Sequence, residues 1–405
     1  MEPVDTLCMG CTDTGCDFKP MKLQRRPVGE YDILIDMKYC GVCHSDLSCA
    51  AGHTTGVSGP VKWPCVPGHE LAGICTQVGS KVTKFKVGQQ VGVGCMVDAC
   101  MSCAACLRGE EQMCSKQVGT YNSKDNGSGR AESYPAGGHT LGGYTTKMVI
   151  HEDFTILIPN DYPLKFAGPV MCAGITMYDP MQRQNIKAGD KIGICGFGGL
   201  GQMGCKIAKA LGCEVTVISR GVGKEAFAKE CGADRFIVSS SLEQMKENAN
   251  SLDLILNTIP VYHSYVDFNS LLKRKGGRQV LLGLHKGIAG AMIVNKITGN
   301  RSRILHSGIG GIEATQKVMD LCAEHKIYPD IKVIPAHDLN KVYELLDGAN
   351  DEGLRYVLDI ENTLNEETET KCVADPPKLS HVTGTISAVG ALKESFWLLF
   401  TGKWL

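Results

Sequence analysis

The stretch that decides the fold is residues 191–220, KIGICGFGGLGQMGCKIAKALGCEVTVISR. An apolar run with Ile192 and Ile194 leads into a glycine-rich turn, GFGGLG. A helical pattern then ends at Gly212 and is followed by a second apolar run, residues 215–218. A strand, a tight turn, a helix and a strand within about 30 residues are what a βαβ dinucleotide-binding unit requires.

The glycines of this turn have mechanical reasons. Gly196 permits the tight turn, Gly198 lets a pyrophosphate approach, and Gly201 allows the helix to pack closely on the strand. The N-terminus of the helix then faces the phosphates. A glycine-rich loop of another α/β fold is the alternative, which the flanking strands and helix disfavour. We therefore predict cofactor contacts along the whole turn, Gly196, Phe197, Gly198, Gly199, Leu200 and Gly201.

The end of the second strand indicates which cofactor binds. About 20 residues beyond the glycine turn, where NAD enzymes carry an acid, the chain reads Ser219-Arg220-Gly221, and Lys224 follows. Two cations and a hydroxyl favour the 2′-phosphate of NADP, unless Arg220 and Lys224 are only solvated surface charges.

Further apolar runs extend this unit into a full sheet. Residues 236–238, 252–256, 280–282 and 304–305 alternate with helical stretches and bring the count to six parallel strands, the number of a doubly wound sheet. An amphipathic pattern from Ile312 to Cys322 predicts a helix, and residues 355–360 predict a closing strand. Near the N-terminus, alternation over residues 31–39 predicts another strand.

Length and composition exclude several classes of protein. A chain of 405 residues with 43% hydrophobic residues can bury a large core in two domains. The net charge of -1 gives no support for nucleic-acid or membrane-surface binding, and no uncharged apolar run reaches the roughly 18 residues of a membrane span. Without a basic and apolar leader we expect a cytoplasmic location, where the 20 cysteines serve as thiolate ligands and buried thiols.

Four closely spaced cysteines predict a structural zinc site. In Cys100-x-x-Cys103-x-x-Cys106-x7-Cys114, four thiolates can surround one zinc and leave no position for a substrate. A disulfide cluster is the alternative, which a reducing compartment disfavours. Cys95 lies outside this spacing and is expected to be a core thiol. Cys8, Cys11 and Cys16 could mimic a metal knuckle but lack a fourth ligand nearby, so we expect buried or surface thiols.

Three further segments carry candidate ligands for a second zinc: CGVCHSD at 40–46, PGHE at 67–70 and MCAG at 171–174. Each segment also has an interpretation without a metal: a buried cysteine, a surface histidine beside an acid, and a core thiol before a helix. Chemistry also allows a tetrahedral zinc held by Cys43, His69 and Cys172 with one open position, the pattern of a catalytic site. Sequence spacing does not show that the three residues meet.

At this point the chain resembles the zinc-dependent medium-chain alcohol dehydrogenases, within them the cinnamyl alcohol dehydrogenases and NADPH-dependent aldehyde reductases. The matching sequence segments occur in one order over roughly residues 20 to 360: CGVCHSDL, PCVPGHELAG, VGVGCMVDACMSCAAC, GTYNS, HTLGGYT, MCAGITMY and GFGGLGQMG. The resemblance implies an α/β protein in which a GroES-like, β-rich catalytic domain (1–172 and 306–360) encloses a doubly wound, parallel-sheet Rossmann domain that binds NADP (173–305). We expect a homodimer.

The resemblance also implies the roles of the site residues. It assigns Cys43, His69 and Cys172 to a catalytic zinc that polarises an aldehyde, and Glu70 as an acid that can become a ligand when the substrate site is empty. Ser45 is the candidate proton donor, although its hydroxyl could instead serve a turn. The resemblance further implies cofactor contacts by Ser45, Thr176, Thr258, Gly283, Gly308 and Ile309. Many family members place a relay histidine where this chain has Ser48.

The expected function is reversible hydride transfer between NADP(H) and a primary alcohol/aldehyde pair, with small-molecule substrates. The alternatives are a carbon–carbon or iminium reductase of the same family and a non-catalytic cofactor-binding relative. Plant enzymes of this type carry bulky aromatic residues at the positions of Gly119 and Gly308, so we expect broad aldehyde use here.

Residues 361–405 match nothing in the resembling family. Residues 361–370 are acidic and predicted to form a mobile linker, and the apolar cluster at 396–400 is too short to span a membrane. A docking helix, an interfacial anchor and a disordered tail all remain open for the last segment.

Overall fold

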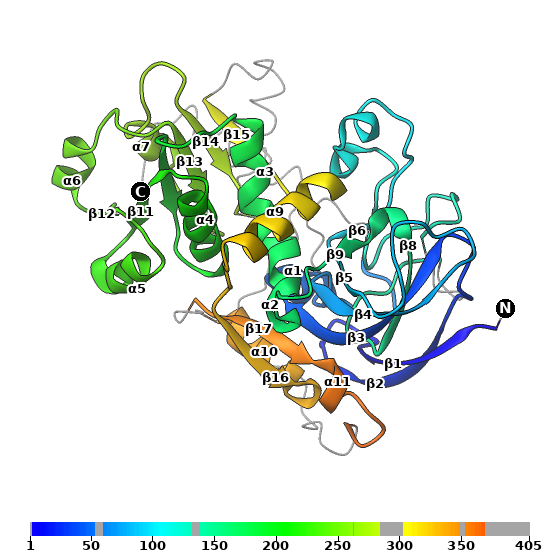
Figure 1. The fold of residues 1–405 in the computed structure, drawn as a ribbon. Coiled ribbons are helices and arrows are strands. Elements are labelled where there is room, and N and C mark those ends of the chain that lie inside the picture. Colours follow the sequence, from blue (N-terminus) through cyan, green and yellow to red (C-terminus); the bar gives the residue numbers. More distant parts are fainter. Residues whose placement is uncertain are drawn as a thin grey trace. The chain divides into compact units, whose positions relative to one another are not determined.

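The computed structural model describes residues 2–52, 60–131, 138–261, 263–283, 303–348 and 353–368. The chain divides into two compact units, which are described separately (Figure 1). Among the described residues, one unit consists of those up to Ile175 and those from Ile309 to Thr368, and the other is Thr176–Gly308. The boundaries expected from the sequence, 172/173 and 305/306, each lie three residues before these limits.

The second unit, Thr176–Gly308, is a six-stranded parallel sheet in which helices lie between successive strands from β10 to β14, green to yellow in Figure 1. The strand order β12-β11-β10-β13-β14-β15 is that of a doubly wound Rossmann sheet. The predicted six parallel strands are thus confirmed: β10 (Lys191–Cys195), β11 (Glu214–Ser219), β12 (Arg235–Val238), β13 (Leu254–Asn257), β14 (Arg278–Leu281) and β15 (Ile304–His306). The intervening helices are α4 (Gly199–Ala210), η5 (Val222–Lys224), α5 (Glu225–Glu230), α6 (Leu242–Glu247) and α7 (Tyr265–Asn269).

The core of this sheet follows from its central strands. Ile192 and Ile194 on β10 and Val215 and Val217 on β11 are fully buried, as expected for strands covered on both faces. β10 pairs with both β11 and β13, so the residues that follow it emerge at the point where the strand order reverses. In doubly wound sheets this is where ligands bind.

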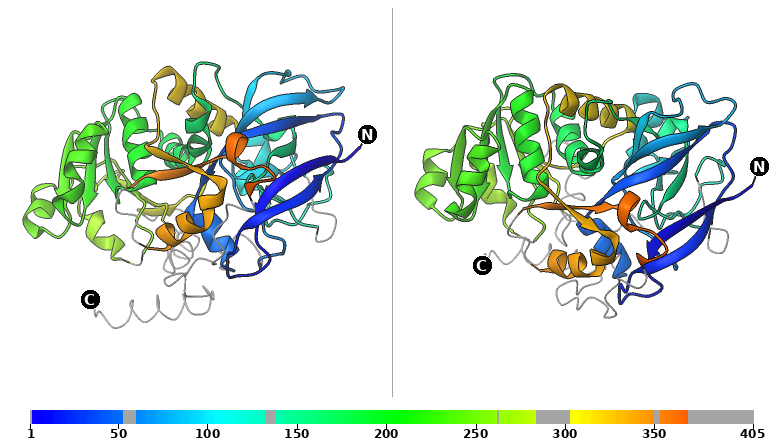
Figure 2. Two further views of the ribbon diagram at one scale, coloured as in Figure 1. Left: turned by 90° about the horizontal axis from the view of Figure 1, so that it is seen from below. Right: turned by 60° about the horizontal axis from the view of Figure 1, so that its bottom comes forward.

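The first unit is built on a seven-stranded, mostly antiparallel sheet, best seen in Figure 2. Its longest strand, β3 (Asp32–Val42), begins one residue after the start of the predicted strand at 31–39 and pairs with three neighbours. The other strands are β4 (Leu71–Val78), β5 (Gln90–Val93), β8 (Lys147–His151), β9 (Ile156–Leu157), β16 (Ile331–Pro335) and β17 (Arg355–Asp359). Two small ribbons add β1 (Val4–Gly10) with β2 (Lys19–Arg25), and β6 (Met96–Asp98) with β7 (Val118–Gly119).

Short helices connect and cover these strands. They are α1 (His44–Ala50), η1 (Cys106–Arg108), η2 (Glu111–Met113), η3 (Glu152–Phe154), α2 (Leu164–Pro169), the π-helix η4 (Val170–Gly174), α9 (Ile312–Glu324), η6 (Ala336–Asp338), α10 (Leu339–Asp347) and α11 (Ile360–Thr363). α3 (Ile175–Arg183) continues η4 into the other unit. The helix predicted from Ile312 and the closing strand predicted at 355–360 correspond to α9 and β17.

Residues 361–368 correct the expectation of a mobile linker beginning at residue 361. α11 follows β17 directly, Leu364 and Thr368 are buried, and Lys38 pairs with Glu361 at 2.5 Å. The Thr363 hydroxyl accepts a hydrogen bond from the Ala336 backbone N–H at 2.8 Å. The acidic composition misled the prediction because a single leucine and two threonines are enough to dock this segment. Residues 369–405, including the apolar cluster at 396–400, lie outside the described residues.

The described cysteines are all free thiols. Cys8, Cys11 and Cys16 are buried in the core of the first unit, and burial raises the pKa of the Cys8 thiol to about 12. Cys11 pairs with Cys65 through two backbone hydrogen bonds. Nowhere in the described part of the chain is there a helix both long enough and apolar enough to cross a membrane.

Candidate active site

Four buried side chains from three separate segments converge in the first unit: Cys43, His69, Glu70 and Cys172. Their ligand atoms all lie within 4.8 Å of one another. The two sulfur atoms are 3.9 Å apart, and His69 Nε2 lies 3.2 Å from Cys172 Sγ. Tetrahedral zinc with Zn–S bonds of about 2.3 Å separates two thiolates by about 3.8 Å. The cluster therefore has the dimensions of a zinc site.

The pairing of β3 with its neighbours explains how these segments meet. β3 runs into α1 at Cys43, the N-cap residue. The β3–β4 register joins Cys40 to Leu71, and the Gly41 N–H donates to the Glu70 carbonyl, which places Glu70 beside the end of β3. Any side chain at Gly41 would meet Glu70 Oε2 at 2.0 Å. Glycine in the CGVC segment is thus required by the site itself.

Cys172 is delivered by an irregular helix. α2 ends at Pro169 and continues as the π-helix η4, with Cys172 at its centre, before α3 begins. A methyl group at Gly168 would meet the Glu70 carbonyl oxygen at 2.3 Å, so this helix packs directly against the segment that carries the acid. π-helical turns are rare and are often found at functional sites.

Asp46 holds three parts of the cluster together, although it is not one of the four converging residues. Fully buried, it accepts hydrogen bonds from the Cys43 N–H at 2.9 Å, the Gly68 N–H at 3.2 Å and the Tyr144 hydroxyl at 2.9 Å. Its Oδ1 also lies 2.9 Å from His69 Nδ1. Because a carboxylate fixes the proton on Nδ1, Nε2 keeps its lone pair for a metal.

Glu70 is paired with Arg355, a residue at the start of β17. Arg355 Nη1 donates to Glu70 Oε1 at 2.8 Å, and both side chains are almost inaccessible to solvent. Burial raises the pKa of Glu70 to about 7, although the Arg355 charge opposes this. Glu70 Oε2 has no hydrogen-bond partner among the described protein atoms. A buried carboxylate oxygen left in this way is suited to a cation.

The Cys43 thiol has an altered pKa, and two serine hydroxyls lie on the helix that follows it. The Cys172 thiol, together with the Arg355 charge, lowers the pKa of the Cys43 thiol despite burial. Ser45, half-buried in α1, has its hydroxyl oxygen 3.7 Å from Cys43 Sγ. Ser48, at the position of the expected relay histidine, is also half-buried.

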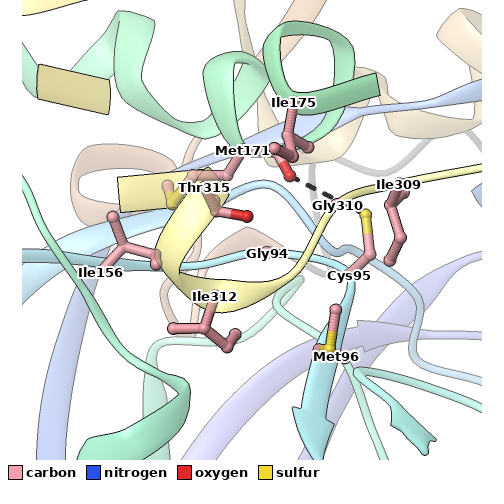
Figure 3. Close-up of a pocket in the computed structure, with 10 residues that line it drawn as sticks. All are labelled: Gly94, Cys95, Met96, Ile156, Met171, Ile175, Ile309, Gly310, Ile312 and Thr315. Carbon is pink, nitrogen blue, oxygen red and sulfur yellow. Dashed lines mark hydrogen bonds between the residues drawn. The ribbon is translucent and has the colours of Figure 1, made fainter. Parts of the chain in front are cut away.

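Cys95 lies beside this cluster and lines a small, mostly apolar cavity. Its thiol interacts with that of Cys172 and lies 3.9 Å from the Met171 carbonyl oxygen, the dashed line in Figure 3. Met171, Ile309 and Ile312 contribute apolar side chains to the same cavity (Figure 3). Cys95 is therefore not simply the core thiol expected from the sequence, since it is partly exposed. Gly119 is placed elsewhere, in β7, where a methyl group would meet Ser123 Oγ at 2.7 Å.

The second cluster, Cys100, Cys103, Cys106 and Cys114, also has its four sulfur atoms within 4.8 Å of one another. Cys106 Sγ lies 3.9 Å from Cys100 Sγ and 3.6 Å from Cys103 Sγ. Backbone N–H groups point at the sulfurs: Cys103 N–H donates to Cys100 Sγ, and Lys116 N–H to Cys114 Sγ, both at 3.3 Å. Hydrogen bonds from Ser102 and Cys103 lower the pKa of Cys100 to about 5. This environment favours the thiolate of Cys100, whereas burial raises the pKa of Cys106 to about 12.

In the Thr176–Gly308 unit the glycine turn has the geometry expected of each glycine. Gly196 follows β10 with a φ of +84°, and a methyl group at Gly201 would meet the Gly196 carbonyl at 2.3 Å. Gly198 caps α4 and has open space where a side chain would stand. Phe197, Gly199 and Leu200 lie in the turn and the first turn of α4.

The other predicted cofactor residues are distributed around this turn and beyond it. The Thr258 hydroxyl lies 3.0 Å from the Cys195 carbonyl and 3.1 Å from that of Gly196. Lys224 Nζ donates to the Phe197 carbonyl at 3.1 Å, whereas Ser219 is half-buried and Arg220 exposed at the end of β11. Thr176 is buried in α3, a methyl group at Gly283 would meet the Ile259 carbonyl at 2.0 Å, Gly308 has open space, and Ile309 falls in the first unit at the cavity.

Comparison with known proteins agrees with this architecture. The profile of the alcohol dehydrogenase GroES-like domain matches residues 29–160, and that of the zinc-binding dehydrogenases matches residues 199–324. A probable cinnamyl alcohol dehydrogenase of Oryza sativa subsp. japonica is 40% identical over 359 residues, covering 88% of this chain and 94% of the relative. The chain belongs to the cinnamyl alcohol dehydrogenase branch of the zinc-binding alcohol dehydrogenases.

Solved structures of cinnamyl alcohol dehydrogenases share the fold. The enzyme of Sorghum bicolor superposes with a TM-score of 0.78 at 34% identity, covering 90% of this chain and all of that one. The enzyme of Helicobacter pylori, solved as a complex with NADP(H), gives a TM-score of 0.76 at 34% identity, with 89% and 100% coverage. The predicted GroES-like and Rossmann fold class is confirmed.

Two residues of this cinnamyl alcohol dehydrogenase homologue were missed by sequence reasoning, Asp46 and Arg355. Asp46 had a signal, because an acid three residues after Cys43 at the start of a helix is the pattern of a capping box. The sequence signal for Arg355 was weaker. Arg355 begins the largely apolar strand RYVLD, and a cation in such a strand is buried only when it is paired. Nothing in the sequence identified its partner, 285 residues away.

Proposed function

We propose that this protein reduces aldehydes to primary alcohols with NADPH, at a zinc ion held by Cys43, His69 and Cys172. The observation that carries the proposal is the convergence of these three ligands with Glu70 in one buried cluster. A non-catalytic relative would have no chemical need for such a cluster. The relatives described above are named for alcohol dehydrogenation, so they do not favour a carbon–carbon or iminium reductase.

Zinc fits the residues on two grounds. The sulfur–sulfur distance of 3.9 Å matches the separation of about 3.8 Å expected for two thiolates on tetrahedral zinc. The unpartnered Glu70 Oε2 offers a further oxygen ligand. Bound zinc supplies a Lewis acid that polarises a carbonyl oxygen, and NADPH supplies the hydride.

The protein's own side chains orient the site and handle the proton. Asp46 keeps the proton of His69 on Nδ1, so Nε2 faces the cluster as a ligand. Arg355 holds Glu70 by its Oε1. We assign proton donation to the Ser45 hydroxyl, which lies close to Cys43 and is half-exposed. With Ser48 in place of a histidine, the next proton carrier outward is a hydroxyl or solvent.

We propose that NADP is the cofactor because of the residues at the end of β11. Arg220 is exposed and available to a ligand, Lys224 lies against the glycine turn, and the strand ends without an acid. Two cations suit a 2′-phosphate. Replacement of Arg220 by alanine should weaken NADPH binding and spare NADH. Equal catalytic efficiency with both cofactors in the unmodified protein would contradict this assignment.

We further propose a second, structural zinc ion at the four-cysteine cluster, hence about two zinc ions per chain. Cys106 and Cys114 are buried and Cys100 and Cys103 half-buried, and backbone N–H groups donate to the sulfurs, which supports a closed site. Elemental analysis of freshly purified, folded protein tests the number. One zinc ion per chain, or none, would contradict it.

Substrate use should be broad. Where the resembling plant enzymes carry bulky aromatic residues, this chain has Gly119 and Gly308, and an apolar site without those side chains discriminates weakly between apolar substrates. The test of the whole function is the initial rate of NADPH and NADH oxidation with a panel of aliphatic and aromatic aldehydes. We expect turnover of many aldehydes with NADPH. A preference on the order of 10³-fold for one phenylpropenyl aldehyde would contradict broad use, and no turnover would contradict the function.

We also propose a cytoplasmic homodimer. The free thiols throughout the described residues are consistent with a reducing compartment. β15 lies at the edge of the six-stranded sheet, with Ile304 and Leu305 only half-buried, and an exposed strand edge can pair with a second copy. Light scattering that gives the mass of one chain at micromolar concentration would exclude the dimer.

A further inference from the structure

The four-cysteine cluster is connected to the cavity beside the catalytic cluster through the N-terminus of α9. This helix begins with Gly311 as N-cap, and no side chain of its own caps it. Instead Glu111, a buried residue of η2, accepts a hydrogen bond from the Ile312 N–H at 3.0 Å. A carboxylate at this end both satisfies a free N–H and complements the helix dipole.

The backbone around Glu111 links its contact with Ile312 to the cysteine ligands. Glu111 lies between Cys106 and Cys114, and its carbonyl accepts a hydrogen bond from the Cys114 N–H at 3.0 Å. Gly109, whose N–H donates to the Cys106 carbonyl, packs against Gly311: a methyl group at Gly311 would meet the Gly109 oxygen at 2.0 Å. The backbone of the cysteine lobe and the first turn of α9 are therefore in direct contact.

On its other side, the same helical turn forms part of the cavity. Ile309, Gly310, Ile312 and Thr315 line it together with Cys95 and Met171, as Figure 3 shows. Met171 precedes the ligand Cys172, and the Cys95 thiol interacts with that of Cys172. A second contact fixes α9 farther along, where the Gln316 side chain makes two hydrogen bonds to the backbone of Leu157 in β9.

We propose that Glu111 is a positioning residue, which holds the α9 side of this cavity in place and makes the substrate selectivity of the site depend on the four-cysteine lobe. The selectivity part rests on the proposed aldehyde reduction, whereas the positioning part does not. Without Glu111 the Ile312 N–H loses its acceptor, and among the described residues the hydrogen bonds of Gln316 and side-chain packing remain to hold the segment from Ile309 to Thr315. Larger aldehydes, which need the cavity side to be in place, should be affected more than small ones.

The test compares Glu111→Ala with Glu111→Gln, which keeps an oxygen acceptor, and with Glu313→Ala. Glu313 is the matched control because it is a carboxylate in the first turn of α9 that is exposed and pairs only with Lys317 among its described contacts. Loss of a hydrogen bond to a charged group should speed amide hydrogen exchange at residues 312–315 about tenfold in Glu111→Ala. The kcat/KM ratio of a bulky aromatic to a small aliphatic aldehyde should fall by a similar factor through KM, with both zinc ions retained. Glu111→Gln should restore most of both effects.

Unchanged exchange in Glu111→Ala, or an equal change in Glu313→Ala, would overturn the proposal. The proposal would also be overturned if Glu111→Ala showed faster exchange but kept the kcat/KM ratio of bulky to small aldehydes that the unmodified protein has. If Glu111→Ala does not fold, Gly311→Ala provides the test from the other side of the contact, with the same expected and contradicting results. If the unmodified protein reduces no aldehyde, the proposed function fails, and the exchange measurement alone decides whether Glu111 positions α9.

Discussion

The two ligand clusters are built in opposite ways. Cys100, Cys103, Cys106 and Cys114 come from one segment of 15 residues, and neighbouring backbone N–H groups point at their sulfurs. The catalytic cluster combines residues up to 129 positions apart, and buried side chains such as Asp46 and Arg355 hold it. A locally closed site needs little beyond its own segment. A site assembled from remote segments requires the whole fold.

The largest effect is expected from removing one ligand of each cluster. The Cys43→Ser variant should keep its fold and lose turnover, because its ligand belongs to a site held by surrounding side chains. The Cys103→Ser variant should give a lower yield of folded protein, since structural zinc contributes its binding energy to folding. Zinc content, circular dichroism and NADPH oxidation measured on both variants check this.

A matched control for these variants is Cys75→Ser, a buried free thiol of β4 outside both clusters. It should retain both zinc ions and most of the turnover. The contrast between the clusters would disappear if Cys43→Ser lowered the yield as much as Cys103→Ser.

Replacement of Asp46 by asparagine should weaken only the catalytic cluster. The carboxylate accepts from two backbone N–H groups and a tyrosine hydroxyl and fixes the tautomer of His69, which one amide cannot reproduce. Outer partners of this kind contribute about 10–100-fold to metal affinity. Titration with a zinc chelator should remove one zinc ion early and the other as in the unmodified protein. Asp36→Asn, at a half-exposed position of β3, should change neither.

Breaking the buried ion pair should cost stability. Arg355→Met leaves the Glu70 carboxylate buried without its cation, which typically lowers the free energy of unfolding by about 3–5 kcal/mol. The control is Lys38→Met, which removes a cation of the same sheet from a partly exposed pair with Glu361 of α11 and should cost at most about 1 kcal/mol. Urea unfolding curves measure both. Equal losses would mean that Glu70 is not dependent on Arg355.

Local patterns in the sequence predicted the parts of this molecule that are locally determined. The glycine turn, the six strands and the four-cysteine cluster each depend on residues within a short segment, where spacing carries geometry. The meeting of Cys43, His69 and Cys172 was expected only from family resemblance, because it depends on the pairing of β3 with β4 and on the path of η4.

Tertiary partners were the part that the sequence did not reveal. Arg355 reaches Glu70 because the β17–β3 register sets Tyr356 opposite Val42, which brings Arg355 level with Cys43. Glu111 reaches Ile312 across 201 positions, and neither residue belongs to a recognisable motif. Cys95 was expected to be a core thiol because its spacing excluded it from the four-cysteine set, whereas the end of β5 and the start of β6 place it beside Cys172.

The smallest effect concerns where the catalytic unit ends. Truncation after Thr368 removes no proposed ligand and no described strand, so kcat/KM and zinc content should stay nearly unchanged and the free energy of unfolding should change by less than about 0.5 kcal/mol. Truncation after Asn362 removes the buried Leu364 and the Thr363 hydroxyl that accepts from Ala336, beside the sheet that carries Arg355. Burial of one leucine contributes about 1.5–3 kcal/mol, so this shorter chain should unfold earlier in urea and lose the catalytic zinc first. If the two truncated proteins were equally stable, residues 363–368 would not belong to the folded unit. If truncation after Thr368 abolished activity, the catalytic cluster would depend on residues beyond Thr368.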